Sequence, residues 1–395
     1  MIWSILHSID IAIWVIIACS VIYVVFFAII SLFYDKEDRI AAHAAALSNR
    51  QCKFLILYPA YKEDRVIINA VENFLLQDYP TTHYMVAVIS DHMQPETNDY
   101  LRKLPITLLE PVFEKSSKAK AMQYAINEVK GDFDQVVVLD ADNVVRPDFL
   151  DQLNVLCSIY DAIQCHRCAK NADNDVAVLD GASEEINNTI FRKAHNRIGL
   201  SSALIGSGMC FEYKLFKENI FKLSSVGEDK ELEAHLLLQK VFIKYEPDIH
   251  VFDEKVSNKD NFQKQRLRWM TAQIQSLFMQ LPYLPLAIRT GNWDYINKTI
   301  QQALIPRSML VVGAFAWSIF MTVFSLFFSL SWYIKWWCLF LTICISLYLA
   351  SPKQLRSHTV FGKILSVPVL VWKMFMNIPK ISRKTTEFIH TTHDK

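Results

Sequence analysis

The stretch Q-V-V-V-L-D-A-D-N, residues 135–143, joins an apolar run directly to two carboxylates. A short, uninterrupted apolar run bounded by polar residues is typical of a strand that is buried on both faces of a parallel sheet. In such sheets, ligands bind at the carboxyl ends of the strands. The stretch therefore predicts a central strand with a functional site at its end.

Further strands and helices alternate around this stretch. Apolar runs at 54–58, 84–90 and 106–110 are predicted strands, whereas residues 66–76 and 118–129 have the apolar spacing of helices. Repeated strand and helix units with continuous apolar strands indicate a sheet that is covered by helices on both faces. We therefore predict an α/β domain with a Rossmann-like, mostly parallel sheet.

Long apolar runs at both ends of the chain indicate membrane-spanning helices. Of the 395 residues 52% are hydrophobic, and a net charge of +1 argues against a nucleic-acid binder. Residues 11–33 carry no charge and reach the roughly 20 apolar residues that a span needs, while 309–334 and 336–350 form a predicted helical hairpin. A signal peptide is the weaker interpretation of the first run, because no Lys or Arg precedes it.

Basic residues flank these spans on one side. They are Lys36, Arg39, Arg50 and Lys53 after the first run, and Lys353, Arg356 and Lys363 after the hairpin. The positive-inside rule then predicts an external N-terminus and a cytoplasmic domain between the spans. We expect a multi-pass protein of a bacterial inner membrane, in contact with membrane lipid.

These features divide the chain into five predicted segments. They are an N-terminal anchor (1–35), the α/β domain (36–275), membrane-interface helices (276–307), the transmembrane hairpin (308–352), and an interfacial amphipathic helix with a cytoplasmic tail (353–395). Residues 364–378 are short and contain Pro368 and Lys373, which favours an interfacial helix over a span. In the tail, His390 and His393 are expected to be disordered, with a fold of His390 or Thr391 over the site as the alternative.

Eight cysteines are scattered without a disulfide-like pattern, as expected in a reducing compartment. The run C-H-R-C, from Cys165 to Cys168, resembles half of a zinc site. No second pair lies at ligand spacing, so we predict packing cysteines on a strand.

The two carboxylates of the opening stretch, Asp140 and Asp142, are candidate metal ligands. Residues two apart on an extended segment point to the same side and can address one site. Carboxylate oxygens suit Mg²⁺ or Mn²⁺, and two of them leave coordination positions free for water and phosphate oxygens. A simple turn is the alternative, because Asp and Asn are common in turns.

A second acidic pair, Glu228 and Asp229, follows Gly227 at the predicted start of a helix. Carboxylates are favoured there as caps, which is the sufficient explanation if the pair is taken alone. Beside a metal site, the pair becomes a candidate general base.

The run Q-K-Q-R-L-R-W, residues 263–269, lies in a segment with helical spacing. Arginine suits a diphosphate because its planar fork donates two hydrogen bonds, and an indole can stack on a sugar ring. The side chains assigned to such a site are Gln265, Arg268 and Trp269. A basic helix on anionic lipid is the alternative, and Lys264 and Arg266 are assigned to a solvated or lipid-facing side.

Four elements stand in the order P-A-Y-K-E, D-A-D, G-E-D and Q-R-L-R-W within residues 53–270. Together they resemble the membrane-bound family 2 glycosyltransferases, which include cellulose, chitin-oligosaccharide, hyaluronan and poly-N-acetylglucosamine synthases. The resemblance implies a GT-A fold and inverting, metal-dependent transfer from a nucleotide sugar donor, usually a UDP-sugar. The implied acceptor is a growing β-linked polysaccharide, with export or accessory subunits as partners. The alternatives are one transfer to a lipid-linked acceptor and, more remotely, a glycoside hydrolase or a membrane scaffold.

The resemblance also implies roles for single residues. The implied nucleotide-sugar contacts are Tyr61, Glu63, Asp91, Lys118, Asp140, Gln265, Arg268 and Trp269. The implied metal ligand is Asp142, together with Asp140, and the implied base is Asp229, with Glu228 beside it. The implied acceptor contacts are Gly206, Ser207, Gly208 and Trp269.

Overall fold

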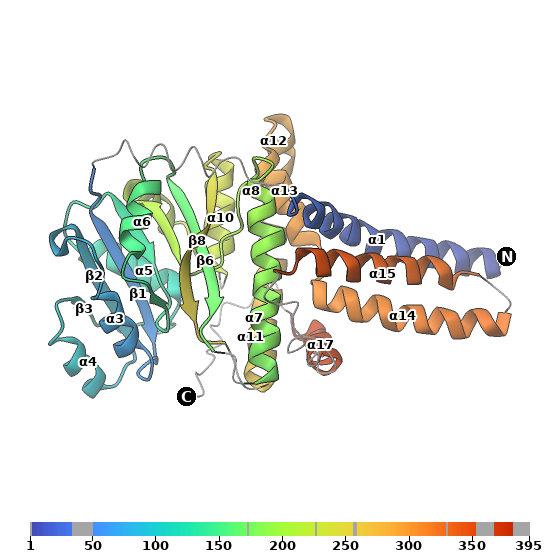
Figure 1. The fold of residues 1–395 in the computed structure, drawn as a ribbon, viewed down its shortest axis with the longest axis horizontal. Helices are drawn as coiled ribbons and strands as arrows, with labels where there is room; N and C mark the ends of the chain where they lie inside the picture. The colour runs from blue at the N-terminus through green and yellow to red at the C-terminus, as the bar shows by residue number, and fades with distance from the viewer. Residues whose placement is uncertain are drawn as a thin grey trace.

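The computed structural model describes residues 2–33, 50–171, 174–225, 227–255, 259–328, 331–352 and 367–381. A sheet domain occupies one end of the molecule, and three long helices extend from the other end (Figure 1). A layer of helices lies between the two parts (Figure 1). The predicted α/β fold with flanking membrane helices is confirmed.

The sheet has eight strands in the order β3-β2-β1-β4-β7-β6-β8-β5. Their bounds are β1 Phe54–Tyr61, β2 Tyr84–Asp91, β3 Thr107–Leu109, β4 Gln135–Val138, β5 Val144–Val145, β6 Ala162–Ala169, β7 Met209–Glu212 and β8 Ile243–Asp253. Strands β3, β2, β1 and β4 are parallel, and β6 is parallel to β8. Strand β7 runs antiparallel between β4 and β6, and β5 is antiparallel to β8. The sheet is therefore mixed, with a parallel half that carries the opening stretch.

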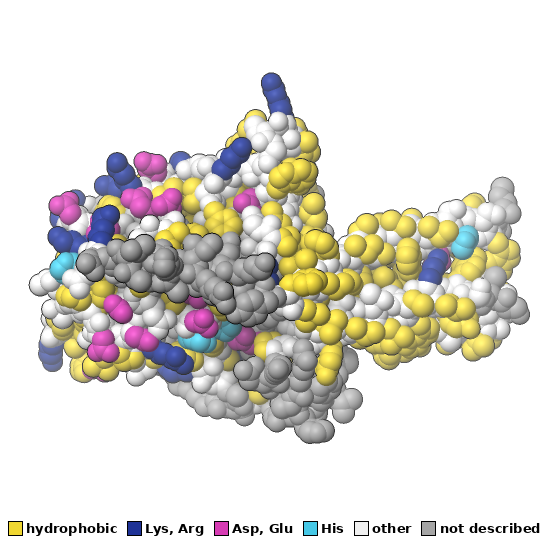
Figure 2. Space-filling model, turned by 45° about the horizontal axis from the view of Figure 1, so that its top comes forward, with side chains coloured by type: hydrophobic (Ala, Val, Ile, Leu, Met, Phe, Trp, Pro, Cys, Tyr) yellow, Lys and Arg dark blue, Asp and Glu magenta, His cyan; other side chains and the backbone are white. Residues whose placement is uncertain are grey.

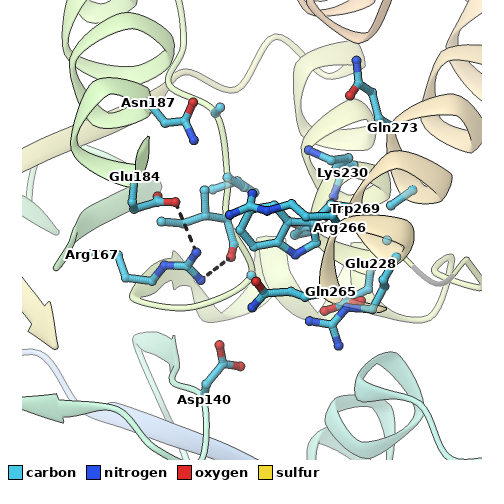
Figure 3. Close-up of a pocket in the computed structure, with 18 of the residues that line it drawn as sticks. Asp140, Arg167, Glu184, Asn187, Glu228, Lys230, Gln265, Arg266, Trp269 and Gln273 are labelled. Atoms are coloured by element: carbon cyan, nitrogen blue, oxygen red, sulfur yellow. Dashed lines mark hydrogen bonds and ion pairs between the residues drawn. The ribbon is translucent and has the colours of Figure 1, made fainter. Parts of the chain in front are cut away.

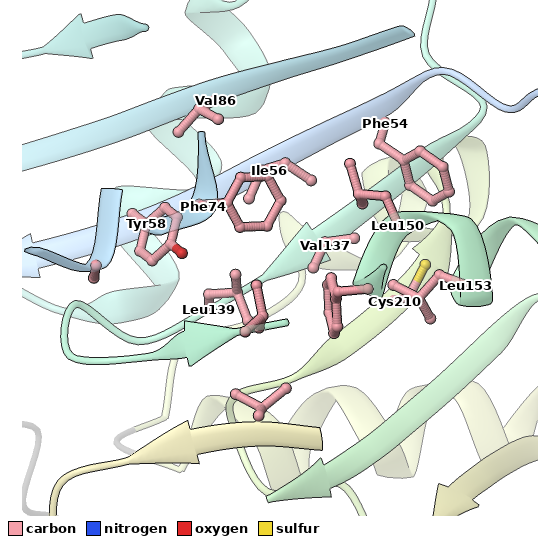
Figure 4. Packing of buried hydrophobic residues seen from close by; sticks show 14 of the residues in the cluster. Phe54, Ile56, Tyr58, Phe74, Val86, Val137, Leu139, Leu150, Leu153 and Cys210 are labelled. Atoms are coloured by element: carbon pink, nitrogen blue, oxygen red, sulfur yellow. The ribbon is translucent and has the colours of Figure 1, made fainter. Parts of the chain in front are cut away.

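Alternate side chains of the central strands pack on opposite faces of the sheet. On one face, Ile56 and Val137 pack with Phe74 and Leu150 in one core cluster (Figure 4). On the other face, Val136 and its neighbours pack in a second cluster. The named side chains are all fully buried, which explains why the strands appear in the sequence as continuous apolar runs.

Helices cover both faces of the sheet. The first face carries α3 (Ile67–Phe74) and α6 (Phe149–Leu156), with α4 (Pro95–Leu101) next to α3. The second face carries α5 (Lys118–Glu128), α9 (Tyr213–Ile220) and α10 (Glu228–Leu238). Two of these helices, α5 and α10, begin with residues of the predicted site, so the site lies where strands end and helices start.

Three helices are long and apolar enough to cross a membrane: α1 (Ile2–Ile30), α14 (Arg307–Phe328) and α15 (Tyr333–Ala350). Helix α15 packs against both others, and most side chains on the face of this bundle seen in Figure 2 are hydrophobic. Helix α1 begins before the predicted run at 11–33 and includes Asp10, whose charge pairs with Lys335 and whose Oδ1 accepts from Trp336 Nε1 at 2.8 Å. The N-terminus lies at the end of the bundle farthest from the sheet (Figure 1).

The layer between sheet and bundle consists of α7 (Asp175–Asn187), α8 (Ala194–Asn196), α11 (Lys259–Gln280), α12 (Leu284–Arg289) and α13 (Trp293–Ala303). A π-helical turn at Asn188–Lys193 joins α7 to α8. Helix α17 (Val367–Phe375) packs against α11 and α14. With 9 residues, α17 is shorter than the roughly 20 that a span needs. The basic residues Lys36, Arg39, Lys353, Arg356 and Lys363, and the tail with His390, Thr391 and His393, lie outside the described residues.

Candidate active site

A cavity of about 450 Å³ lies between the carboxyl ends of the parallel strands and the helix layer. All the predicted site residues except Ser207 and Gly208 line this cavity. The predicted residues that line it are Tyr61, Glu63, Asp91, Lys118, Asp140, Asp142, Gly206, Glu228, Asp229, Gln265, Arg268 and Trp269. Elements that are far apart in the sequence therefore contribute to one site, as the strand-end argument predicted.

Asp140 follows β4 and faces the start of helix α5. Its Oδ1 is in an ion pair with Lys118 Nζ, which also donates to the carbonyl of Gly206 at 2.6 Å. Burial alone would raise the pKa of Asp140, but the charges of Lys118, Arg167 and Arg268 outweigh it and lower the pKa. Asp140 therefore stays ionised at neutral pH.

Asp142 is buried and held by the turn that follows β4. Its Oδ2 accepts the backbone N–H of Glu254 at 2.7 Å, and its Oδ1 accepts Asn143 Nδ2 at 3.0 Å. Asn143 Oδ1 in turn accepts the backbone N–H of Asp140 at 3.0 Å. The D-A-D-N segment is thus a turn, and its two carboxylates still line the cavity. Asp140 and Asp142 thus offer carboxylate oxygens on one side of the cavity, and these are the donors that a hard divalent cation prefers.

Glu228 and Asp229 begin helix α10, on the side of the cavity near Gly206. A Cβ added at Gly206 would lie 3.9 Å from Asp229 Oδ2 and 3.8 Å from Lys118 Nζ. Burial, followed by the charge of Asp229, raises the pKa of Glu228 to about 7, against the opposing effects of Lys118 and Arg268. Glu228 therefore gains or loses its proton near neutral pH, directly beside Asp229.

Helix α11, which packs against α10, brings the residues of Q-K-Q-R-L-R-W to the cavity. Gln265, Arg268 and Trp269 line the cavity, whereas Lys264 is exposed, as predicted. The assignment of Arg266 to a solvated or lipid-facing side is wrong, because Arg266 also lines the cavity and is largely buried. Its guanidinium lies 4.1 Å from the centre of the Trp269 ring (Figure 3). The same guanidinium pairs with Asp180 of α7.

The sequence profile of a family described as "Glycosyltransferase like family 2" matches residues 52–272. The chain belongs to this family. No curated protein sequence matches the chain significantly. The match covers every predicted site residue, and it places the chain among glycosyl-transferring enzymes rather than hydrolases or scaffolds.

Several solved structures resemble this family 2 protein distantly. The mannosyltransferase PcManGT from Pyrobaculum calidifontis, in complex with GDP-Man and Mn²⁺, is 16% identical with a TM-score of 0.49, over 82% of this chain and 97% of that one. S. aureus TarS 1–349 is 14% identical with a TM-score of 0.43, over 83% and 90% of the two chains. The same protein in complex with UDP-GlcNAc is 13% identical with a TM-score of 0.39, over 83% and 90%.

Two predicted acceptor residues of the family 2 domain do not line the cavity. The Ser207 side chain is fully buried, and its hydroxyl contacts Asn143 Oδ1 behind the D-A-D-N turn. Gly208 has φ +62°, and a Cβ there would lie 2.9 Å from Val251 Cγ2. Of the three loop residues only Gly206 lines the cavity, so Ser207 and Gly208 support the turn and β7 instead.

A group of cavity-lining charges in the family 2 protein was not predicted. Arg167 of β6 lies 3.5 Å from Glu184 Oε2 and 3.4 Å from Asp253 Oδ2, and it donates to the carbonyl of Ile205 at 3.3 Å (Figure 3). Arg192 lies 3.0 Å from Glu184 Oε1. The sequence contained one indication of this group, because Arg167 lies on a strand that was expected to be buried. A charged residue in such a place requires buried partners.

The raised pKa of Glu228 predicts the pH dependence of the transferase. We expect kcat/KM to rise about tenfold per pH unit and to level off near pH 7, because the acid pair accepts a proton best once Glu228 has lost its own. In Glu228→Gln this inflection should be lost, because the Gln side chain has no proton to lose in this pH range. Initial rates across the pH range test this, and an unchanged inflection in the variant would contradict it.

Proposed function

We propose that this protein is an inverting, metal-dependent glycosyltransferase that uses a nucleotide diphosphate sugar, in the first place a UDP-sugar. The acceptor we propose is a growing β-linked polysaccharide at the membrane. One observation carries the proposal: a single cavity is lined by Asp140 and Asp142 on one side, the acid pair on α10, and Arg268 with Trp269 on α11. Family membership supports the reaction class.

The donor would lie along the strand ends. Asp142, with Asp140, would hold Mg²⁺ or Mn²⁺, which supplies charge compensation for the diphosphate when bound. Lys118 and Arg268 are the cations that would bind the diphosphate oxygens directly. Gln265 lies one helical turn before Trp269 and would donate to the same end of the donor.

The nucleobase would lie at the far end of the cavity, near Tyr61, Glu63 and Asp91. Asp91 ends β2, and its Oδ1 lies 2.5 Å from His92 Nδ1. The rings of Tyr61 and His92 meet edge to face with their centres 5.7 Å apart. This arrangement offers an aromatic face and a carboxylate acceptor, which are the contacts that a nucleoside needs.

The chemical step we propose is direct displacement. Asp229 would take the proton from the acceptor hydroxyl, whose oxygen forms the new bond to the anomeric carbon as the bond to the diphosphate breaks. Attack from the face opposite the leaving group inverts the configuration. Trp269 would hold the acceptor sugar by stacking, which keeps the hydroxyl in line with the anomeric carbon.

The cavity continues from the site to the membrane boundary. Its wall there includes Val24 of α1, Arg307 of α14 and Met374 of α17. An acceptor at this end would meet the lipid surface, which suits a polymer that is exported or an acceptor that is carried by a lipid. Among the described residues, however, the membrane-spanning helices contribute to the cavity wall only at this boundary.

A second candidate is the transfer of one sugar to a lipid-linked acceptor that bears phosphate. Arg192, Arg266 and Arg307 line the membrane end of the cavity. Within the described part of the chain, the buried Nε–H groups of Arg192 and Arg266 have no hydrogen-bond acceptor. Phosphate oxygens would satisfy these donors, because guanidinium groups bind phosphate with charge-assisted hydrogen bonds.

Product analysis separates these acceptors. Purified protein in lipid vesicles is incubated with labelled UDP-glucose, UDP-N-acetylglucosamine, UDP-galactose or GDP-mannose. A ladder or long polymer supports the first proposal, and a single labelled product that extracts with lipid supports the second. Neither transfer nor donor hydrolysis with any of these donors would overturn both.

The metal requirement is tested in the same assay. We expect EDTA to abolish transfer, and added Mn²⁺ or Mg²⁺ to restore it. The Asp142→Asn variant should lose roughly 100-fold in rate at saturating metal, because an amide is a poorer ligand for a hard cation. Full activity in EDTA would refute the metal-dependent mechanism.

We also propose that the α/β domain is cytoplasmic and that the five segments predicted from the sequence are the units of the chain. The N-terminus lies at the end of the bundle farthest from the sheet domain (Figure 1), so a membrane around the bundle would separate the N-terminus from that domain. A cysteine introduced at Ser4 should then react with an impermeant maleimide in intact cells. A cysteine introduced at Asp132 should react only after lysis.

A further inference from the structure

Three potential metal ligands meet on the sheet outside the catalytic cavity. They are His166 and Cys168 of β6 and His250 of β8, and one ligand atom from each lies within 4.8 Å of the others. None of the three lines the cavity. The group is partly accessible, because each residue is half-buried.

The strand register explains how these residues come together. His166 and His250 are paired across the parallel strands β6 and β8, directly after an irregularity between Cys165 and His166. Side chains two apart on a strand point to the same face, so Cys168 lies on the face of His166. Arg167, between them, points to the opposite face and lines the cavity. The group and the cavity thus lie on opposite faces of β6.

The surroundings of the group resemble a prepared metal site. His166 Nδ1 lies 2.5 Å from the hydroxyl of Tyr245, and a hydrogen bond on one ring nitrogen orients metal-bound imidazoles in known sites. The other nitrogen, Nε2, lies 3.1 Å from Glu185 Oε1, so an ion between them would take the place of this hydrogen bond. His250 Nδ1 is buried and has no hydrogen-bond partner among the described residues. A buried polar atom left without a partner is costly, and a metal ion would compensate it.

We propose that His166, Cys168 and His250 bind a zinc-type transition-metal ion, with Glu185 or a water in the fourth position. Two imidazoles and one thiolate are the donor set of tetrahedral Zn²⁺ sites, whereas Mg²⁺ and Mn²⁺ prefer the oxygen donors of Asp140 and Asp142. Binding converts the Cys168 thiol to a thiolate and releases one proton. Bound metal fixes β6 to β8 and thereby positions Arg167 in the cavity wall.

This site differs from the half-site suggested by C-H-R-C. Cys165 is fully buried in the main hydrophobic core, next to Cys210, and it is not part of the ligand group. The prediction of a packing cysteine is confirmed for Cys165. Cys168 takes the role of ligand, together with histidines that the spacing of the two cysteines did not identify.

Cobalt(II) tests the site, because it replaces Zn²⁺ and absorbs in the near ultraviolet when bound to a thiolate. The full-length protein in detergent is stripped with EDTA and titrated with Co²⁺ in excess Mg²⁺, which occupies the carboxylate site. We expect a thiolate-to-cobalt band that saturates at one equivalent and disappears when Zn²⁺ is added. The readout does not depend on transfer, so its failure leaves the proposed function standing.

Variants locate the ion. Cys168→Ser should abolish the band, and His250→Ala should weaken Co²⁺ binding at least tenfold. Cys165→Ser and Asp142→Asn are the matched controls and should keep it. Thermal unfolding without metal identifies variants that fail to fold. If one of the two ligand variants fails to fold, His166→Gln is used in its place. The proposal is overturned by a folded protein without the band, by a band that survives Cys168→Ser, or by a band that is lost in folded Cys165→Ser.

Discussion

Replacement of Asp229 by Asn is expected to lower the rate of sugar transfer by at least ~100-fold, the scale of general-base catalysis. Asn has the shape of Asp but cannot accept the proton of the acceptor hydroxyl. The affinity for the nucleotide donor should change little, because the proposed diphosphate contacts, Lys118 and Arg268, remain. Single-turnover transfer of a labelled sugar gives the rate, and calorimetric titration with UDP gives the affinity.

Two variants make this experiment decisive. Asp132→Asn is the matched control, since Asp132 is exposed and does not line the cavity, and it should have normal activity. Glu228→Gln tests whether the neighbouring acid is the base instead. Normal turnover in Asp229→Asn, or a much larger loss in Glu228→Gln than in Asp229→Asn, would refute the assignment of Asp229.

The fold could be predicted because its strands are buried on both faces. Val136, Val137 and Val138 are fully buried, so β4 appears in the sequence as an apolar run without alternation. The insertion of antiparallel β7 next to β4 was not predictable in this way. Its four residues, Met209–Glu212, carry no sequence pattern that indicates which strand they pair with or in which direction they run. Strand order depends on packing between distant segments, which no local pattern encodes.

The site was predictable where its residues follow strands or begin helices, as Asp140, Asp142 and Asp229 do. Arg266 was not, because its partner Asp180 lies 86 positions earlier in the chain. A basic residue on an amphipathic helix has the same local pattern whether it faces solvent or a buried carboxylate. Ser207 was predicted to line the site and does not. A loop motif does not indicate which of its side chains points into the site.

Replacement of Arg266 by Met is expected to lower the free energy of unfolding by about 3 kcal/mol, since it leaves the carboxylate of Asp180 buried without its partner. The side chains of Arg266 and Asp180 are only 11% and 4% exposed, so water can compensate little of this loss. Lys264→Met is the matched control, because Lys264 is exposed two positions earlier on α11 and should change stability little. Thermal unfolding in detergent compares the two variants, and equal melting temperatures would contradict the prediction.

The double variant Arg266→Met/Asp180→Leu separates the stabilising role of this pair from its role in the cavity. Apolar replacement of both members of a buried ion pair is often neutral or stabilising, so most of the lost stability should return. Activity should not return with it, because the guanidinium that lines the cavity and stacks on Trp269 is still missing. If activity recovers together with stability, Arg266 acts only through the fold. If stability alone recovers, Arg266 contributes its charge to the bound acceptor or donor.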